Sequence, residues 1–510
     1  MKNKLLKRTL LWSVLFMASL IGFFSCSGCS KQQTNVYMVP DDAAFVMHIN
    51  LGNIWNKGDF DHINQISYVK YLLQELRDDN PRDAEVVNDL LNDPNTYGFN
   101  LKGEFFAFMS KTTGDEVCVG YTINDAGKYK NFLKDLCRNT DVVFSSENGY
   151  SLAYTKEHRT AFCWDDNKAY LYSSSSERDA NSYAQKLMSL QEDNSLAQNA
   201  DFNTFLQANN DLGLFVNTDL ALELAGPGEL EQYEEYLDQL QHTSLCLSLN
   251  FENGGIRLPF AILGLENNPG DRFVTDDFNG DLLNYLPQQT LAALSFSFNI
   301  NSLLRMLEGY EDVDLDESVT DGLSVRELIQ SFTGNFAASL SDIRFDGYNG
   351  EDLDITITAV AELNNGSLLK EKMVQSDKAR RDGDSYLFED ETINVGLNGN
   401  VIMVTTKPSL LNMLSGGRSG NGVEKIAQKA KKGNYLYLDL DIHNYPSSLT
   451  QELGSDIVNL AGGFLKDAEF NVTGQGRAEI FIGLQNSDKN SLDFILHYID
   501  DNLTRIQRLL

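Results

Sequence analysis

The feature that most constrains the fold of this chain is an internal repeat. In two places a proline and two polar residues precede an apolar strand, and the strand runs into a helix start that carries an asparagine; these segments begin at Pro40 and Pro287. The copies lie roughly 220 to 250 residues apart, a period far too long for a solenoid repeat. The pattern therefore predicts two domains of one fold.

Six elements recur in the same order in the two copies, which favours duplication over chance. The other matched segments start at Gly103 and Gly334, Glu116 and Leu353, Gly149 and Gly383, and Asp211 and Asn434, and each copy ends with two long strands, Leu245–Phe251 with Ile256–Leu265 and Ala468–Val472 with Arg477–Leu484.

The fold class predicted for each copy is α+β. The strands alternate in hydrophobicity, and turn-rich loops such as Lys111–Asp115 and Asp165–Asn167 join several of them into hairpins. Consecutive hairpins indicate a mainly antiparallel sheet, with helices on the single apolar face. Predicted helices span Asn64–Arg77, Asp83–Leu91, Ala126–Leu136, Glu177–Leu190 and Glu229–Leu240 in the first copy, and Asn301–Leu307, Ser324–Ser331, Gly366–Val374, Pro408–Leu414 and Leu449–Phe464 in the second.

The domain boundaries follow from a polar junction. Residues 266–281 contain Pro269 and two glycines and read as a linker, so repeat 1 is expected to span 37–265 and repeat 2 to span 282–510.

The C-terminal segment of the chain has no counterpart in repeat 1. It places Leu492, Ile495, Ile499, Leu503 and Ile506 on one helical face. We expect this face to pack on the second sheet; a docking helix for a partner is the alternative.

The first residues have the layout of a bacterial lipoprotein signal. A basic start is followed by an uncharged apolar run and then by a small residue before a cysteine. We expect 1–25 to be a signal peptide, Cys26 to be the acylated residue, with Cys29 as the alternative, and 26–36 to be a tether. An uncleaved anchor helix and simple secretion are the other interpretations.

Strong acidity excludes one class of partner. The chain has 41 Lys plus Arg and 73 Asp plus Glu, and removing the four basic residues of the signal leaves 37 − 73 = −36 for the mature chain. Phosphate backbones and anionic lipid headgroups repel such a body, so nucleic-acid binding is not expected, and membrane attachment should come from the lipid anchor.

Cys118, Cys137, Cys163 and Cys246 lie only in repeat 1, and buried thiols are favoured over one optional disulfide.

Catalytic and metal motifs are weak. Two S-x-x-K tetrads, Ser67–Lys70 and Ser367–Lys370, lack the further elements of penicillin-recognising enzymes. The six histidines are isolated, and no catalytic residue and no cofactor is predicted. Asp312, Asp314 and Asp316 resemble the first ligands of a calcium loop, but the turn glycine and the bidentate glutamate are missing, so they are only weak metal candidates.

Three features point to a known family: the lipid signal, the duplicated body and the opening V-P-D-D-A-A-F-V-M-H-I-N-L. In these features the chain resembles a family of Bacteroides-type cell-envelope lipoproteins labelled as a domain of unknown function. This resemblance carries over no catalytic residue. It implies an outer-membrane lipoprotein. Because no acidic residue directly follows Cys26, the resemblance also implies that the protein stays on the periplasmic face.

These observations favour a non-catalytic, lipid-anchored periplasmic protein that binds or scaffolds components of the cell envelope through a protein partner. Two alternatives remain open. One is an envelope hydrolase that acts on glycan or peptide with acidic catalytic groups. The other is a carrier of a small molecule or lipid, with a pocket between sheet and helices. The ligand-binding residues are unknown from the sequence.

Overall fold

The structure is a computed structural model, and contacts divide it into two compact units. Unit 1 comprises Met1–Leu265 and Asn486–Leu510, and unit 2 comprises Glu266–Gln485. The structure describes residues 36–100, 103–113, 116–225, 240–265, 274–275, 277–288, 290–308, 313–320, 322–346, 352–365, 367–376, 380–382, 385–388, 393–415, 427–445, 450, 454–474 and 476–509.

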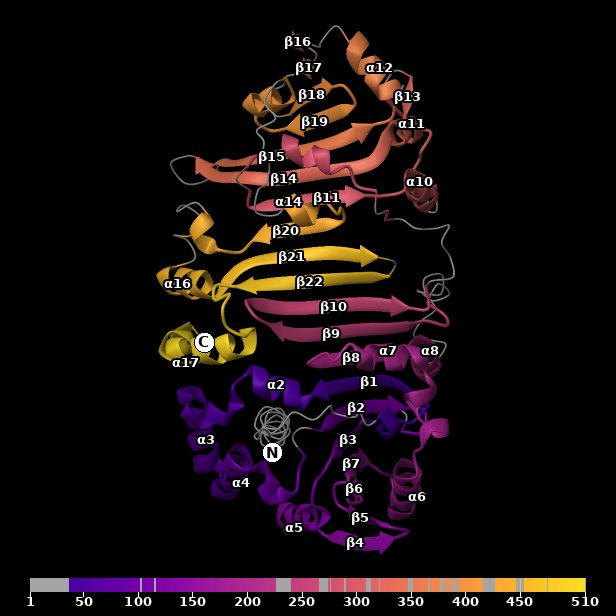
Figure 1. Cartoon of the computed structure of the whole chain (residues 1–510), viewed down its shortest axis with the longest axis vertical. Coiled ribbons are helices and arrows are strands. Elements are labelled where there is room, and N and C mark those ends of the chain that lie inside the picture. Colours follow the sequence, from indigo (N-terminus) through magenta and orange to yellow (C-terminus); the bar gives the residue numbers. More distant parts are fainter. Residues whose placement is uncertain are drawn as a thin grey trace. The chain divides into compact units, whose positions relative to one another are not determined.

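Unit 1 is built on a sheet in which all neighbouring strands are antiparallel (Figure 1). The strand order is β10–β9–β8–β1–β2–β3–β7–β6–β5–β4. The strands are β1 (Ala43–Asn50), β2 (Glu104–Ser110), β3 (Cys118–Thr122), β4 (Val142–Glu147), β5 (Tyr150–Thr155), β6 (Thr160–Trp164), β7 (Lys168–Ser173), β8 (Leu212–Asn217), β9 (Ser244–Glu252) and β10 (Gly255–Leu263).

Helices pack on both faces of this sheet. The α-helices of unit 1 are α2 (Leu51–Lys57), α3 (Ser67–Asp79), α4 (Pro81–Asn92), α5 (Ala126–Leu136), α6 (Glu177–Met188), α7 (Ala200–Gln207), α8 (Thr218–Ala225) and α17 (Ser491–Leu509), and its 3₁₀ turns are Val36–Met38, Phe60–Gln65, Pro94–Tyr97, Glu192–Asn194 and Leu196–Gln198. On β6, Cys163 faces α6 and α7, whereas Trp164 faces α5. We call the α6 and α7 side the inner face and the opposite side the outer face.

Because helices cover both faces, the prediction of helices on one face only is wrong for unit 1. The physical reason is that its strands carry apolar side chains on both sides.

Unit 2 has a sheet with the same strand order as unit 1. The order is β22–β21–β20–β11–β14–β15–β19–β18–β17–β16, again all antiparallel. The strands are β11 (Ala292–Ser297), β14 (Phe332–Asp346), β15 (Asp352–Leu363), β16 (Arg380–Asp382), β17 (Ser385–Phe388), β18 (Asn394–Asn398), β19 (Val401–Thr405), β20 (Tyr435–Asp439), β21 (Leu465–Gly474) and β22 (Arg477–Leu484), and β12 (Ser318–Thr320) pairs with β13 (Leu323–Ser324) in a small separate hairpin.

The core of unit 2 lies on one side of its sheet, which we also call the inner face. There Ala337, Val360 and Met403 of the sheet pack with Leu283 and Leu411. A smaller cluster on the opposite, outer face contains Ala361 with Leu369 and Met373 of α12. The helices are α10 (Ile300–Glu308), α11 (Val325–Gln330), α12 (Leu368–Gln375), α13 (Asn412–Ser415), α14 (Ala427–Ala430) and α16 (Ser455–Phe464), with 3₁₀ turns at Gly280–Tyr285, Pro408–Leu411 and Ile442–Asn444.

Local capping explains why the helix after the first strand of each unit begins where it does. Asn50 Oδ1 accepts a hydrogen bond from Asn53 N at 3.0 Å at the start of α2. Asn299 Oδ1 accepts from Asn301 N and Ser302 N at the start of α10. A side-chain acceptor at this position satisfies backbone N–H groups that have no partner inside the helix.

The C-terminal helix belongs to unit 1, which differs from the expected boundary of repeat 2 at residue 510. α17 contacts α2, α3 and β9, and its Leu492 and Leu496 join the cluster around Trp55. Asp500 of α17 accepts a hydrogen bond from Tyr68 N at 3.0 Å at the start of α3. The prediction that this helix packs on the second sheet is therefore wrong.

Several predicted elements agree closely with the structure, including α5 over Ala126–Leu136 and β22 over Arg477–Leu484. The helix expected over Glu229–Leu240 lies outside the described residues except at its last position. Within the described part of the chain, no helix combines the length and apolarity that a membrane span requires.

Candidate functional site

The outer face of unit 1 carries a row of exposed apolar side chains. Met47, Leu214, Leu247 and Phe260 lie on the adjacent strands β1, β8, β9 and β10, and each is the direct cross-strand partner of the next. Their exposed fractions are 38, 38, 48 and 38 %, respectively. Four strands at the usual spacing make this row roughly 14 Å long. We call it the unit 1 apolar row.

On β9 the sequence directs the larger apolar side chains outward, whereas on β8 the buried Phe215 packs into the inner core. On β8 and β9 the inner face carries the small residues Gly213, Cys246 and Ser248, which are buried. Leu214 and Leu247 alternate with them and point to the outer face. This pattern does not serve the stability of the described unit, because the leucines contribute most to stability when they are buried. An exposed row of this kind is typical of an interaction surface.

Unit 2 has a longer row, which crosses seven strands of its own sheet instead of four. Cross-strand pairing links Ile480, Phe470, Leu436, Leu294, Ala338, Ala359 and Val404 in one line from β22 to β19. All seven are at least partly exposed, and Ile480 and Val404 at the two ends are exposed by 41 and 36 %. Leu438 and Ile357 on the neighbouring row are exposed by 39 and 45 %. We call these residues the unit 2 apolar row.

The inner face of unit 2 again carries small and hydroxyl-bearing residues opposite this row. Ser295, Ser339 and Thr358 are buried there, and Ser295 Oγ donates to Ala430 O at 2.9 Å. Tyr435 and Tyr437 of β20 are also buried on this face, and burial raises the pKa of both phenols. In β9 and β11, therefore, the alternation places leucines on the side away from the main core, whereas Val46 of β1 and Val360 of β15 point into it.

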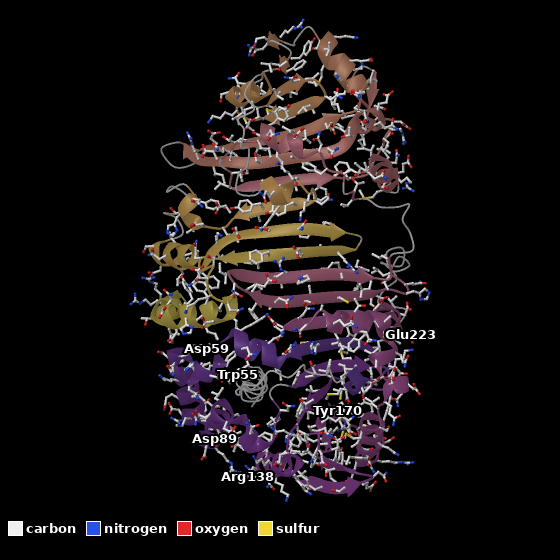
Figure 2. All side chains as sticks on the ribbon, viewed as in Figure 1. Trp55, Asp59, Asp89, Arg138, Tyr170 and Glu223 are labelled. Atoms are coloured by element: carbon white, nitrogen blue, oxygen red, sulfur yellow. The ribbon has the colours of Figure 1, made fainter. Side chains whose placement is uncertain are left out.

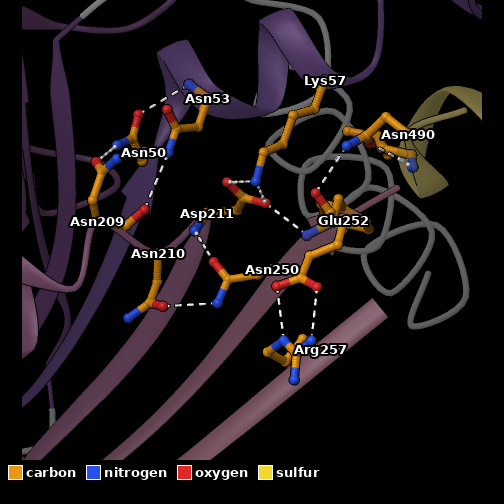
Figure 3. Close-up of polar contacts among 12 residues, drawn as sticks. Asn50, Asn53, Lys57, Asn209, Asn210, Asp211, Asn250, Glu252, Arg257 and Asn490 are labelled. Atoms are coloured by element: carbon orange, nitrogen blue, oxygen red, sulfur yellow. Dashed lines mark hydrogen bonds and ion pairs between the residues drawn. The ribbon is translucent and has the colours of Figure 1, made fainter. Parts of the chain in front are cut away.

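A buried ion pair at the ends of the strands supports the sheet of unit 1 (Figure 3). The side chain of Asp211 is fully buried, and its two oxygens accept hydrogen bonds from Lys57 Nζ at 2.8 and 2.7 Å. Asp211 Oδ2 also accepts from Phe251 N at 2.7 Å, and Asp211 N donates to Asn250 Oδ1 at 3.1 Å. These bonds join α2 to β8 and β9.

An asparagine cluster continues this network beside the ion pair. Asn50 Nδ2 donates to Asn209 Oδ1 at 2.8 Å, and Asn53 Nδ2 donates to Asn209 O at 3.2 Å (Figure 3). Arg257 forms two hydrogen bonds with the carboxylate of Glu252, at 2.8 and 3.0 Å. Since these polar groups satisfy one another, the cluster is a structural brace and leaves few groups for a ligand.

His48 and Glu104 form a second buried polar pair, on β1 and β2. His48 Nε2 contacts Glu104 Oε2, and both residues are at most 5 % exposed. The rings of Phe106 and Phe205 lie 5.0 and 6.4 Å from the imidazole ring. A histidine beside a carboxylate is a familiar catalytic pair. Here the surrounding sheet and aromatic rings close off access, so the arrangement is that of a core pair.

The structure does not assemble a nucleophile from either S-x-x-K tetrad. Ser67 Oγ donates to Asp500 at 3.4 Å, and Lys70 Nζ donates to Gln65 O at 3.0 Å. Ser367 caps α12, and Lys370 Nζ donates to Asn400 Oδ1 at 2.6 Å. In both tetrads the lysine binds another group, as expected if the tetrads arise by chance.

The weak calcium candidates do not form a ligand cluster among the described residues, and Asp312 lies outside them. Asp314 Oδ1 accepts from Asp316 N at 3.0 Å, so this carboxylate closes a turn. Asp316 pairs with Arg326 at 3.3 Å, and Arg326 also pairs with Glu308. A carboxylate neutralised by a guanidinium is a poor calcium ligand.

Cys118, Cys137, Cys163 and Cys246 are buried free thiols. Burial raises the pKa of Cys118 and of Cys163, so both remain protonated at neutral pH. They lie in the sheet core near Tyr170, which Figure 2 labels in the sheet region of unit 1. Cys26 and Cys29, the predicted lipidation residues, lie outside the described residues.

Two concavities lined by described residues are considered in addition to the apolar rows. One, of about 260 Å³, lies in unit 1 and is lined by acidic and aromatic residues that include Glu147, Trp164 and Asp165. The other, of about 420 Å³, lies in unit 2 beside the start of α10 and is lined mainly by side-chain amides and hydroxyls. No sequence motif indicates either concavity, because each combines residues from separate segments of the chain.

The chain belongs to the family described as Domain of unknown function (DUF4836), whose model matches residues 34–492. This match confirms the resemblance noted from the sequence as far as a domain of unknown function that spans most of the chain. No curated protein matches the chain.

Two solved structures show weak similarity. Crystal form IV of TP0453 shares 10 % identity over 44 % of this chain and 79 % of that chain, with a TM-score of 0.28. Crystal form I of TP0453 shares 9 % identity over 46 % of this chain and 80 % of that chain, with a TM-score of 0.25. TM-scores this low assign neither a fold nor a function.

Proposed function

We propose that this protein is a non-catalytic docking module of the cell envelope, which binds a protein partner through the apolar rows of its two units. The observation that carries the proposal is the unit 1 apolar row, in which Met47, Leu214, Leu247 and Phe260 stay exposed on four paired strands. A soluble acidic chain gains nothing by exposing such a row to water.

The energetics favour a partner that covers the row. Complete burial of a leucine side chain contributes about 1.5–3 kcal/mol relative to its exposed state. The side chains of the row are already half covered by their neighbours, so each gains only part of this amount when a partner binds. Several such contacts in one patch still supply the apolar centre of a protein–protein interface.

A protein surface fits the rows better than a lipid chain. The rows lie on the open face of a sheet, and an acyl chain laid there would remain half in water. Small-molecule sites are concave instead, and enclose most of their ligand. The net charge of −36 on the mature chain favours a partner whose apolar patch has a basic rim, since complementary charge speeds association and suppresses wrong partners.

We further propose that the two units arose by duplication and that each binds one site of the partner. The identical strand order of the two sheets supports this, as do the matched segments of the sequence. Two linked sites of modest affinity can bind together far more tightly than either alone, provided that the linker spans the partner's sites.

The same proposal places the protein on the periplasmic face of the outer membrane, held by a lipid on Cys26. Its support is the signal layout of 1–25 and the absence of acidic residues directly after Cys26. Substitution of Cys26 by serine should release the protein from membranes, whereas Cys29→Ser should not. Release by Cys29→Ser alone would assign acylation to the alternative cysteine.

Site-specific photo-crosslinking tests the docking role. A photoreactive phenylalanine analogue replaces Leu247, and in a matched control it replaces Val117, which is 51 % exposed but lies outside the row. Crosslinking in intact cells should give a discrete adduct from position 247 and none from position 117. Equal adducts from both positions, or none from 247, would refute docking at this face.

A further inference from the structure

The concavity of unit 2 has a lining that differs in chemistry from the unit 2 apolar row. It is formed by the end of β11 with the start of α10, by the turn from α11 into β14, and by the residue after β15, and it has a volume of about 420 Å³. Side-chain amides and hydroxyls make up most of its lining, and they include Ser297, Asn299, Asn301, Gln330, Asn335 and Asn364. Pockets of about 300–1,000 Å³ hold small organic ligands.

The wall of this pocket is fixed by the backbone. Gly334 adopts a φ of +99°, which side chains rarely permit, and a Cβ at this position would lie 2.0 Å from Phe298 O. Phe298 N donates to Gly334 O at 3.2 Å. The glycine therefore lets β14 approach the end of β11 closely and holds the two sides of the pocket together.

Two of the amides form a fixed frame. Asn335 Oδ1 accepts from Asn279 N at 2.9 Å, and its Nδ2 donates to Glu362 Oε2 at 2.9 Å. Asn364 Nδ2 donates to both Gln330 O and Phe332 O at 2.9 Å. These bonds order the pocket before any ligand binds, which lowers the entropic cost of binding.

Other amides of the pocket have unused hydrogen-bonding capacity. Among the described residues, the side chains of Asn301 and Gln330 are exposed at the rim of the pocket and form no hydrogen bond within the protein, and Asn299 uses only its side-chain oxygen, to cap α10. In unit 1 the corresponding asparagine, Asn50, donates its Nδ2 to Asn209 instead. The Nδ2 group of Asn299 is thus available to a ligand in unit 2, whereas that of Asn50 in unit 1 is not.

The remaining chemistry of the pocket selects a neutral ligand. Within the described residues that line it, no lysine, arginine or histidine occurs, and Asp277 is the one charged side chain. Phosphate or carboxylate groups would find no positive charge there. Phe298 and Phe332 supply apolar surface between the amides.

We propose that this pocket binds an uncharged saccharide of one or two rings. Each sugar hydroxyl both donates and accepts hydrogen bonds, which matches the paired donor and acceptor of each side-chain amide. The carbon-bound hydrogens of the ring pack against aromatic side chains. The site is separate from the apolar rows, so the proposal does not depend on the docking role.

Isothermal titration calorimetry on the full mature chain tests the assignment. The probes are N,N′-diacetylchitobiose and maltose as neutral disaccharides, glucose 6-phosphate as an anionic sugar, and N-acetyl-dialanine amide as a peptide. At least one neutral disaccharide should bind, and the anionic sugar and the peptide should not. Binding of the peptide alone, of the anionic sugar, or of no probe would overturn the proposal.

Variants then locate the site. Asn301→Ala and Gln330→Ala should each weaken saccharide binding by about two- to tenfold, as expected for one lost hydrogen bond. Gln185→Ala, an exposed amide on α6 of unit 1, is the matched control and should leave the affinity unchanged. Leu438→Asn in the unit 2 apolar row should also leave it unchanged. Saccharide binding that is unaffected by both pocket variants would contradict the proposed site.

Discussion

At the residue scale, Asp211 is a buried polar side chain whose loss should destabilise unit 1. Its carboxylate is completely buried and accepts bonds from Lys57 Nζ and Phe251 N. Asp211→Ala leaves a backbone donor without a partner and removes the counter-charge of Lys57. We expect a loss of about 2–4 kcal/mol in the free energy of unfolding, measured by urea denaturation.

A control on the surface separates this effect from a general response to lost charge. Asp501→Ala removes an exposed carboxylate of α17 and should change the free energy of unfolding by less than about 0.5 kcal/mol. Equal losses for the two variants would contradict the role assigned to Asp211.

Asp467 should make the stability of unit 2 depend on pH. Burial raises the pKa of its carboxyl group, and Lys466, 3.9 Å away, only partly offsets this effect. When a carboxyl group has a higher pKa in the folded state than in the unfolded state, the folded protein binds its proton more tightly. The protein therefore loses stability as the pH rises from the unfolded-state pKa through the folded-state pKa. Asp467→Asn should therefore raise Tm at neutral pH and leave it unchanged well below the ordinary aspartate pKa. A Tm gain that is the same at both pH values would contradict this cause.

At the element scale, α17 should stabilise unit 1. Its Leu492 and Leu496 pack on the cluster around Trp55. Leu496→Asn should increase hydrogen exchange in α2 and α3, because it places a polar amide in an apolar contact. Thr504→Asn on an exposed position of the same helix is the control. Faster exchange in β20 and β21 of unit 2, with unit 1 unchanged, would instead support the original expectation from the sequence.

The sequence predicted elements well where the signal was local. The apolar spacing and capping Asp125 define α5, and alternation defines β22. It failed for α17, because an amphipathic face shows that a helix packs but not on which sheet. The apolar rows were also missed. The alternation of apolar and polar residues around Leu214 and Leu247 shows that one side of each strand is apolar. Such a side usually faces the core, but Leu214 and Leu247 are exposed.

The candidate sites escaped prediction for a related reason. The unit 2 pocket joins Asn301, Gln330 and Asn364, which are far apart in sequence and carry no motif. The acidic composition made Asp314 and Asp316 prominent, yet one closes a turn and the other pairs with Arg326. Contacts between distant loops decide such sites, and a single sequence does not encode them in a readable spacing.

At the scale of the whole molecule, each of the two units presents an apolar row, and the chain is strongly acidic, with a net charge of −32. Association with a partner that has a basic rim should therefore slow as ionic strength rises, since screening weakens long-range attraction between exposed charges. The apolar contacts should control the dissociation rate. Surface plasmon resonance with the captured partner at two salt concentrations separates the two contributions.

The most direct test of the docking account is recovery of the partner by the lipidated full-length protein after mild crosslinking of gently solubilised membranes. Wild type is compared with the double variant Leu214→Asn/Leu247→Asn and with the control Val117→Asn. The account predicts a stoichiometric partner with wild type and with the control, and its loss with the double variant at unchanged Tm. Full recovery of the partner by the double variant would contradict the account.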